Sequence, residues 1–211
     1  EDGIDDLRLW RANAAQEGWM LQQAAGRPIV MLIARLVPLK RIGDFLAVVR
    51  RLIDAGTPLF PVLMLYGGSQ AVKRAFRREF ETTFAPGEAE LFQFVGTPQD
   101  LMRHATLGVS CSEVEGLPKN ILEFLALGVP VVCSDIPQHR RLVVDGKNGL
   151  LYPLGDLEAL QERVARLLGD AGLREQLGRA CRDGVAHRRW ADTARGVFQV
   201  YREIVGGDGK A

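Results

Sequence analysis

The sequence has few of the residues that build disulfide frameworks and metal centres. Its 211 residues include three cysteines (Cys111, Cys133 and Cys181) and three histidines, and no spacing among them matches a disulfide pattern or a metal-ligand motif. Cys111 and Cys133 lie in apolar runs, where small buried thiols are common. We therefore expect inert core cysteines in a reducing compartment, and neither a metal nor another cofactor.

The sequence also lacks an excess of either charge and a long apolar run. Lys and Arg number 27 and Asp and Glu 26, which gives no case for a nucleic-acid partner. The sequence contains no run of about 18 apolar residues, so no membrane span is predicted. The opening Glu-Asp-Gly-Ile-Asp-Asp is not a signal peptide and has no initiator methionine. These absences favour a cytoplasmic piece of a longer chain, with peripheral attachment at the inner membrane face as the alternative.

What the sequence does contain is a series of short apolar runs that alternate with amphipathic stretches. The runs predict strands at 29–34, 61–66, 91–95, 107–111, 129–133 and 150–152. The amphipathic stretches predict helices at 9–25, 42–55, 70–84, 99–105, 156–168, 173–185 and 190–205. This alternation predicts an α/β fold, a Rossmann-like parallel sheet with helices on both faces. The domain would span 29–205, after a linker and first helix at 1–28 and before a disordered tail at 206–211.

The stretch at 112–123 stands between two of the predicted strands and opens the helix that connects them. Pro118 suits the first turn of a helix, where a missing N–H is tolerated. We expect the backbone N–H groups of Lys119 and Asn120 to point out of the helix start, where an anion would bind. Glu123 lies about one turn further into the helix and would face the same crevice.

Parallel sheets of this type bind ligands outside the carboxyl ends of their strands. The loops at 35–41, 67–68, 96–97 and 113–120 all follow predicted strands and should meet at that edge. Two well-placed cations in these loops, Arg35 and Lys40, suit a diphosphate. The carboxylates suit the hydroxyls of a sugar or ribose, because a carboxylate accepts from two neighbouring OH groups. A nucleotide that carries a sugar satisfies both sets.

Three blocks of the sequence resemble the retaining glycosyltransferases of family 4, which have the GT-B fold. Ala-Arg-Leu-Val-Pro-Leu-Lys at 34–40 is similar to the family's Gly-Arg-Leu…Lys loop, and residues 115–123 match its two glutamates separated by seven residues. The stretches at 128–132 and 145–151 resemble its closing blocks. The resemblance covers roughly residues 29 to 203.

The resemblance implies roles for individual residues. By comparison with the family, Arg35 and Lys40 of this chain would hold the donor's phosphates. Glu115 would lie by the transferred sugar, and Glu123 would hold the ribose. Arg35, Lys40 and Glu115 are therefore the predicted catalytic residues. The resemblance extends the predicted donor site to Gly67, Gly68, Val95, Thr97, Gly116, Leu117, Pro118, Lys119, Asn120 and Glu123.

Three positions depart from the family pattern. Ala34 and Arg41 stand where glycine is common, and both add bulk near the phosphate loop. Arg141 stands where many members have Glu. These departures put the donor preference in doubt, and leave the predicted fold unchanged.

The family transfers a sugar from a nucleotide diphosphate sugar, such as a UDP or GDP sugar, to an acceptor hydroxyl with retention of anomeric configuration. The implied acceptor is a sugar or a lipid-linked glycan, as in cell-envelope polysaccharide synthesis. Gly3-Ile4-Asp5 resembles the linker into the second of two GT-B domains. The resemblance thus implies a donor-binding C-terminal domain whose acceptor-binding N-terminal domain is absent, and which is inactive alone.

Two other functions remain open, a sugar-nucleotide epimerase-like GT-B enzyme and a non-catalytic nucleotide-binding module. Taken singly, Arg35 and Lys40 are ordinary surface cations, Glu115 a loop charge, and Glu123 a helix-dipole partner. The histidines His104, His139 and His187 are expected at the surface or at caps. The basic helix face at 73–78 is expected in solvent, with membrane contact as the alternative. The aromatic residues of the last helix are expected in the core, with part of their stripe against the absent domain.

Overall fold

The computed structural model describes residues 14–93, 98–186 and 190–206. Its centre is a six-stranded sheet in the order β3-β2-β1-β4-β5-β6, and every neighbouring pair is parallel. The strands are β1 (Ile29–Arg35), β2 (Phe60–Tyr66), β3 (Glu90–Gln93), β4 (Leu107–Ser110), β5 (Val131–Ser134) and β6 (Gly149–Tyr152). All six were predicted, so the predicted fold class is confirmed.

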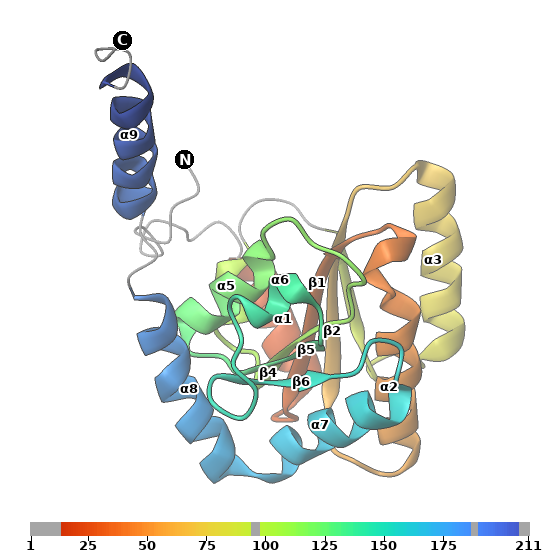
Figure 1. The fold of residues 1–211 in the computed structure, drawn as a ribbon. Coiled ribbons are helices and arrows are strands. Elements are labelled where there is room, and N and C mark those ends of the chain that lie inside the picture. The colour runs from red at the N-terminus through yellow and green to blue at the C-terminus, as the bar shows by residue number, and fades with distance from the viewer. Residues whose placement is uncertain (1–13, 94–97, 187–189, 207–211) are drawn as a thin grey trace.

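In the described residues, helices pack around this sheet, except for α9, which extends away from it (Figure 1). They are α1 (Ala14–Ala24), η2 (Pro38–Lys40), α2 (Ile42–Asp54), α3 (Gln70–Thr83), α4 (Gln99–Met102), α5 (Lys119–Leu127), α6 (Pro137–Arg140), α7 (Leu157–Gly169), α8 (Ala171–Val185) and α9 (Trp190–Gly206). Asp156 caps α7 as predicted, since its side chain accepts from the N–H of Ala159 at 2.9 Å. Pro118 precedes α5 as its N-cap instead of lying in its first turn.

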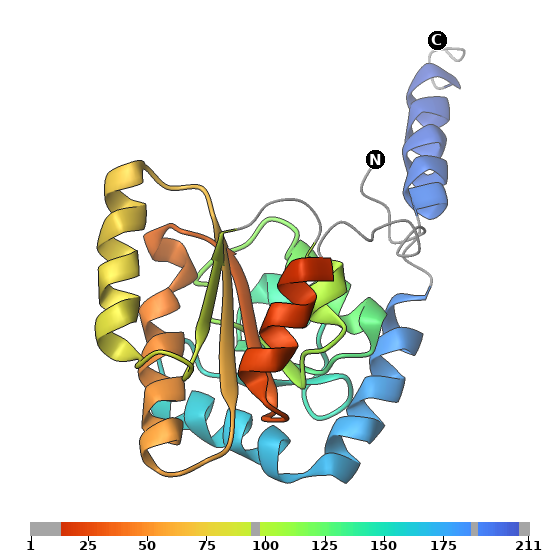
Figure 2. The same cartoon turned by 180° about the vertical axis from the view of Figure 1, so that it is seen from behind.

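Both faces of the sheet are covered, because its strands are apolar on both sides. Residues of β1 alternate between the two halves of the core: Val30 and Leu32 pack with α2, α3 and α7, whereas Met31 and Ile33 pack with α1, α4 and α5. Figure 2 shows α1 on the face opposite α2. The continuous apolar runs in the sequence follow from this double burial.

The strand order creates a crevice at the carboxyl ends of β1 and β4. The chain runs from β1 outward to β2 and β3, then returns to β4 on the other side of β1. Connections that leave two neighbouring strands in opposite directions open a gap between them, and this is where such sheets bind ligands. The loops at 36–41 and 111–118 therefore lie side by side, and the N–H of Glu113 donates to the carbonyl of Leu39 at 2.9 Å.

Helix α9 projects away from the sheet in both views (Figures 1 and 2). Phe198 is 65% exposed and Tyr201 63% exposed. This exposure contradicts the expectation that both side chains belong to the core and agrees with the alternative that part of the stripe lies exposed. The place of that stripe against another domain stays a prediction. Gly206, assigned to the tail, ends α9; the rest of that tail and the start of the predicted 9–25 helix fall outside the described residues.

Candidate functional site

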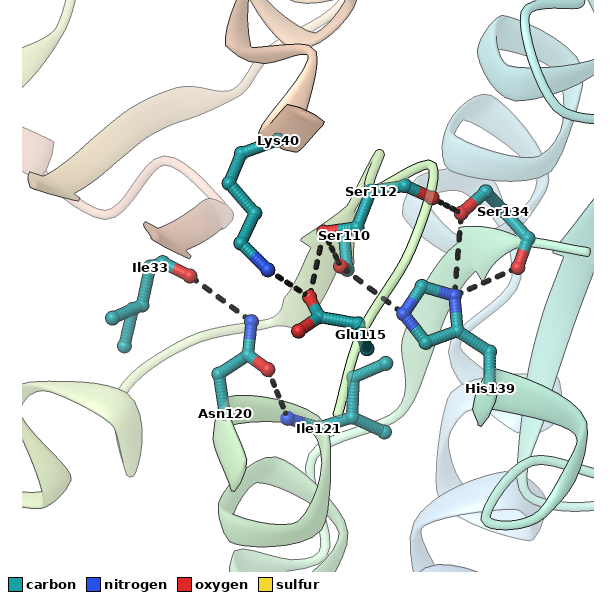
Figure 3. Close-up of polar contacts among 9 residues, drawn as sticks. All are labelled: Ile33, Lys40, Ser110, Ser112, Glu115, Asn120, Ile121, Ser134 and His139. Carbon is teal, nitrogen blue, oxygen red and sulfur yellow. Dashed lines mark hydrogen bonds and ion pairs between the residues drawn. The ribbon is translucent and has the colours of Figure 1, made fainter. Parts of the chain in front are cut away.

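An ion pair between Lys40 and Glu115 occupies the crevice. The Nζ atom of Lys40 lies 2.6 Å from Oε1 of Glu115, and the side chains are only 16% and 10% exposed. Pro38 starts the short helix η2 that carries Lys40, and Arg41 then turns the chain into α2 with a φ of 45°. Two predicted catalytic residues, from loops far apart in the sequence, thus point toward each other (Figure 3).

Glu115 has a second partner on its own loop. The Ser112 hydroxyl donates to the same oxygen, Oε1, at 2.7 Å. Gly116 follows Glu115 and is exposed, and a Cβ atom added there would meet no atom within 4 Å. The arrangement combines a held carboxylate and a cation next to an exposed stretch of backbone.

The start of α5 is fastened to the end of β1 by Asn120. Its Nδ2 donates to the carbonyl of Ile33 at 3.0 Å, and its Oδ1 accepts from the N–H of Ile121 at 2.9 Å. The N–H of Lys119 donates to the Leu117 carbonyl at 2.9 Å. The prediction that this N–H points outward for an anion is therefore wrong, because the turn already uses it. For the N–H of Asn120 it stays a prediction.

Arg35 is the last residue of β1, and Gly67 directly follows the last residue of the neighbouring strand β2. A Cβ on Gly67 would lie 3.8 Å from Nε of Arg35, and one on Gly68 would lie 3.4 Å from the carbonyl oxygen of Leu36. Both glycines have φ above +70°, which a side chain would strain. They let the loop after β2 approach the loop after β1, as a shared binding edge requires.

The Arg41 side chain pairs with two carboxylates of the protein itself. Its guanidinium lies 2.7 Å from Asp44 and 3.1 Å from Glu113, and these hydrogen bonds raise the pKa of Arg41 above its ordinary value. Glycine is common here in the resembled family, but this chain uses the side chain to join α2 to the 111–118 loop.

Glu123 and Tyr66 complete the edge. Gln99 donates from Nε2 to Oε1 of Glu123 at 3.0 Å. Burial raises the pKa of Tyr66, Arg35 lowers it, and Glu115 and Glu123 raise it further, so all three predicted site residues act on one phenol. The sequence analysis did not identify Tyr66 and Gln99 as site residues. Their positions could have indicated them, because Tyr66 ends a strand directly before Gly67 and Gln99 begins a helix.

His139 lies beneath the Glu115 loop and is fully buried, at 0% exposure. The prediction of a surface or capping histidine is therefore wrong. Its Nδ1 lies 2.7 Å from the Ser134 carbonyl and its Nε2 lies 3.5 Å from Oγ of Ser110. The missed signal was its place three residues from two apolar side chains, Ile136 and Leu142.

Comparison with known proteins places this geometry in a family. The family model described as "Glycosyl transferases group 1" matches residues 27–170, more than half of the chain. The chain belongs to this family.

Two curated relatives and one crystal structure illustrate the extent of the likeness. The chain is 32% identical to the phosphatidyl-myo-inositol mannosyltransferase of Mycobacterium leprae over 57% of this chain and 34% of that one. It is 29% identical to the 2-deoxystreptamine N-acetyl-D-glucosaminyltransferase of Streptomyces fradiae over 97% of this chain and 49% of that one. It superposes on Anabaena HepE, crystallised with UDP and glucose, with a TM-score of 0.73 and 18% identity, over 92% of this chain and 53% of that one. The chain thus spans about a third to a half of these three proteins, and its sheet is that of a GT-B domain.

The residues described for this family member contain no group of three or more His, Cys, Asp or Glu side chains placed to hold a metal ion. The three cysteines are buried, as predicted for core thiols. Burial raises the pKa of Cys111 and of Cys181 to about 12, which keeps both thiols protonated and poorly nucleophilic. None of the helices in the described ranges is long and apolar enough to cross a membrane.

The basic face of α3 borders a hollow next to the site. Arg74 and Arg77 are exposed, as predicted for a solvated face. Together with Lys73, Phe76 and Leu91 they line a cavity of about 170 Å³. The predicted donor residues Val95 and Thr97 fall in a segment outside the described residues, so their placement stays a prediction.

Proposed function

We propose that this chain is the donor-binding domain of a retaining glycosyltransferase that transfers a sugar from a nucleotide diphosphate sugar to an acceptor hydroxyl. The observation that carries the proposal is the Lys40–Glu115 pair, 2.6 Å apart and largely buried at the β1–β4 crevice. A buried cation at a switch point suits a phosphate, and a carboxylate beside it suits a sugar hydroxyl.

The diphosphate would bind between Lys40 and Arg35. A phosphate oxygen is a strong partner for an ammonium group and would compete with Glu115 for Lys40. Glu115 would keep the Ser112 hydrogen bond and could then accept from a hydroxyl of the transferred sugar. Glu123, held through one oxygen by Gln99, would accept from the ribose.

These residues would serve the transfer through electrostatics. In an oxocarbenium-like transition state the diphosphate gains negative charge as it leaves. Lys40 and Arg35 would stabilise that charge, because η2 and the end of β1 carry these residues at the crevice. A second domain would supply the acceptor, a sugar or lipid-linked glycan, and exclude water on closing. We propose that the reaction takes place in the cytoplasm, with a UDP or GDP sugar as donor.

A melting panel with nucleotides and nucleotide sugars tests the proposal. A ligand at about 100 times its Kd stabilises the folded protein by about 2.7 kcal/mol, which corresponds to a Tm increase of about 5–10 °C at this size. We expect that shift with one set of UDP, GDP or ADP compounds. A panel without any shift would favour a non-binding module, and an epimerised nucleotide sugar among the products would favour the epimerase alternative.

Replacing Glu123 with Gln should weaken recognition of the ribose. The amide keeps the size of the side chain but offers one acceptor oxygen in place of two. We expect the variant to discriminate between a ribonucleotide and its 2′,3′-dideoxy analogue about tenfold less than the parent, because about 1.5 kcal/mol of charge-assisted bonding is lost. Affinities by titration calorimetry give the answer, and unchanged discrimination would assign Glu123 a structural role.

A further inference from the structure

A buried histidine with no part in the proposed function stands at one end of a polar chain that reaches Glu115. The Nδ1 of His139 lies 2.7 Å from the carbonyl oxygen of Ser134. A carbonyl only accepts hydrogen bonds, so Nδ1 carries a hydrogen whether the ring is neutral or charged. The proton that titrates is therefore the one on Nε2, and this nitrogen lies 3.5 Å from Oγ of Ser110.

Two serines connect this nitrogen to the candidate site (Figure 3). Oγ of Ser110 lies 3.4 Å from Oγ of Ser112, whose hydroxyl lies 2.7 Å from Glu115. The carboxylate only accepts, so the single hydrogen of Ser112 is committed to it. Ser110 and Ser112 are 4% and 2% exposed, so bulk water does not compete for these bonds. The hydrogen of Ser110 is thus the one that can change direction.

The protonation state of His139 decides that direction. When the ring is neutral, Ser110 donates to Nε2, and no hydrogen lies between the two serine oxygens. When Nε2 is protonated it donates to Ser110, which is then able to donate to Ser112. Every bond from the imidazolium to Glu115 then points toward the carboxylate, an arrangement that stabilises both charges.

The charges around His139 link this switch to the donor. Burial lowers the pKa of His139 most, while the Ser134 carbonyl and Glu115 raise it and Lys40 lowers it. A diphosphate bound to Lys40 would offset that cation and bring negative charge of its own, so the pKa of His139 would rise. The other ionisable side chains on α6 and at the adjoining strand ends are Asp135 and Arg140, which pair with each other, and the exposed Arg141. The buried phenol of Tyr152 and the thiols of Cys111 and Cys133 complete this set.

We propose that His139 is a positioning residue of the donor site, which takes up a proton from solvent when a nucleotide diphosphate sugar binds and thereby secures Glu115 through Ser110 and Ser112. The inference rests on the function proposed above. Because the bound form holds the proton more tightly, affinity should be highest below the pKa of the unbound protein. It should fall as pH rises between the two pKa values and level off above that of the complex.

Titration calorimetry with the nucleotide sugar selected by the melting panel tests this, from about pH 5.5 to 8 around the ordinary histidine pKa. Its diphosphate is esterified at both ends and does not itself titrate in this range. Repeating each titration in two buffers of different ionisation enthalpy gives the number of protons taken up. We expect uptake approaching one proton, and an affinity gain at low pH of about tenfold for each unit of pKa difference.

Three variants test whether the pH dependence of binding comes from the hydrogen bonds that join His139 to Glu115 or from histidines in general. His139→Asn retains a donor for the Ser134 carbonyl but cannot be protonated, and Ser110→Ala leaves a protonated Nε2 without its acceptor. Both should bind with no uptake and a flat pH profile, and their melts report on folding. His104→Asn is the matched control, since His104 lies 2.5 Å from Glu17 of α1 and should leave the profile unchanged.

The outcomes are distinct. Wild-type binding without proton uptake, or wild-type pH dependence in both variants, overturns the role of His139 and leaves the donor site standing. If His139→Asn does not fold, Ser110→Ala decides the question. Absence of binding to every nucleotide sugar overturns the donor site and this inference together.

Discussion

Replacing Lys40 with Ala should lower the affinity for a nucleoside diphosphate about 10- to 100-fold and leave the affinity for the matching nucleoside nearly unchanged. A hydrogen bond to a charged group contributes about 1.5–3 kcal/mol, and only the diphosphate forms one with Lys40. Arg35→Ala should act in the same direction. The exposed cation Lys147 lies in the turn before β6, so Lys147→Ala is a matched control.

The Lys40 variant has a second consequence that makes the test sharper. Without the ammonium, the buried carboxylate of Glu115 keeps only its Ser112 partner and repels the incoming phosphates. Adding Glu115→Gln to Lys40→Ala should therefore restore part of the diphosphate affinity. Equal losses for nucleoside and diphosphate would show that Lys40 supports the fold and not the ligand.

We expect the 211 residues alone to bind the donor but to transfer no sugar to an acceptor. The chain spans about a third to a half of related glycosyltransferases, and the proposed function assigns the acceptor to a second domain. Holding acceptor and donor together accounts for about 7–11 kcal/mol of a barrier, a rate factor of about 10⁵ to 10⁸. Transfer assays should show donor hydrolysis at most, and co-expression with an acceptor-binding half from a relative should restore transfer. Sugar transfer by the chain alone would overturn the proposed division of the protein.

The sheet could be predicted because each of its strands is specified by residues that are adjacent in the sequence. Apolar runs with polar or glycine-containing loops at their ends specify strands buried on both faces, and β1 and β2 needed nothing more. The start of β5 was missed by two residues, since Val129 reads as part of the apolar run. Its N–H is instead bonded to the Phe124 carbonyl at 2.9 Å, at the end of α5, and pairing with β4 begins only after that turn.

The sequence predicted which residues belong to the candidate site, but not which of their side chains contact one another. The strand order brings the loops of Arg35, Lys40 and Glu115 together, as the rule for parallel sheets anticipated. The rule says nothing of which side chain meets which, so the Lys40–Glu115 pair was not foreseen. His139 was misjudged for the same reason: its partners Ser110 and Ser134 lie 29 and 5 residues away, on strands whose neighbours only the fold defines.

A crystal structure of the chain with the nucleotide diphosphate sugar from the melting panel tests the central claim most directly. The account predicts phosphate oxygens within hydrogen-bonding distance of Lys40 Nζ and the Arg35 guanidinium, with the sugar beside Glu115. A nucleotide seated elsewhere, for example in the hollow beneath Lys73 and Arg77 of α3, with the Lys40–Glu115 pair intact and untouched, would contradict it.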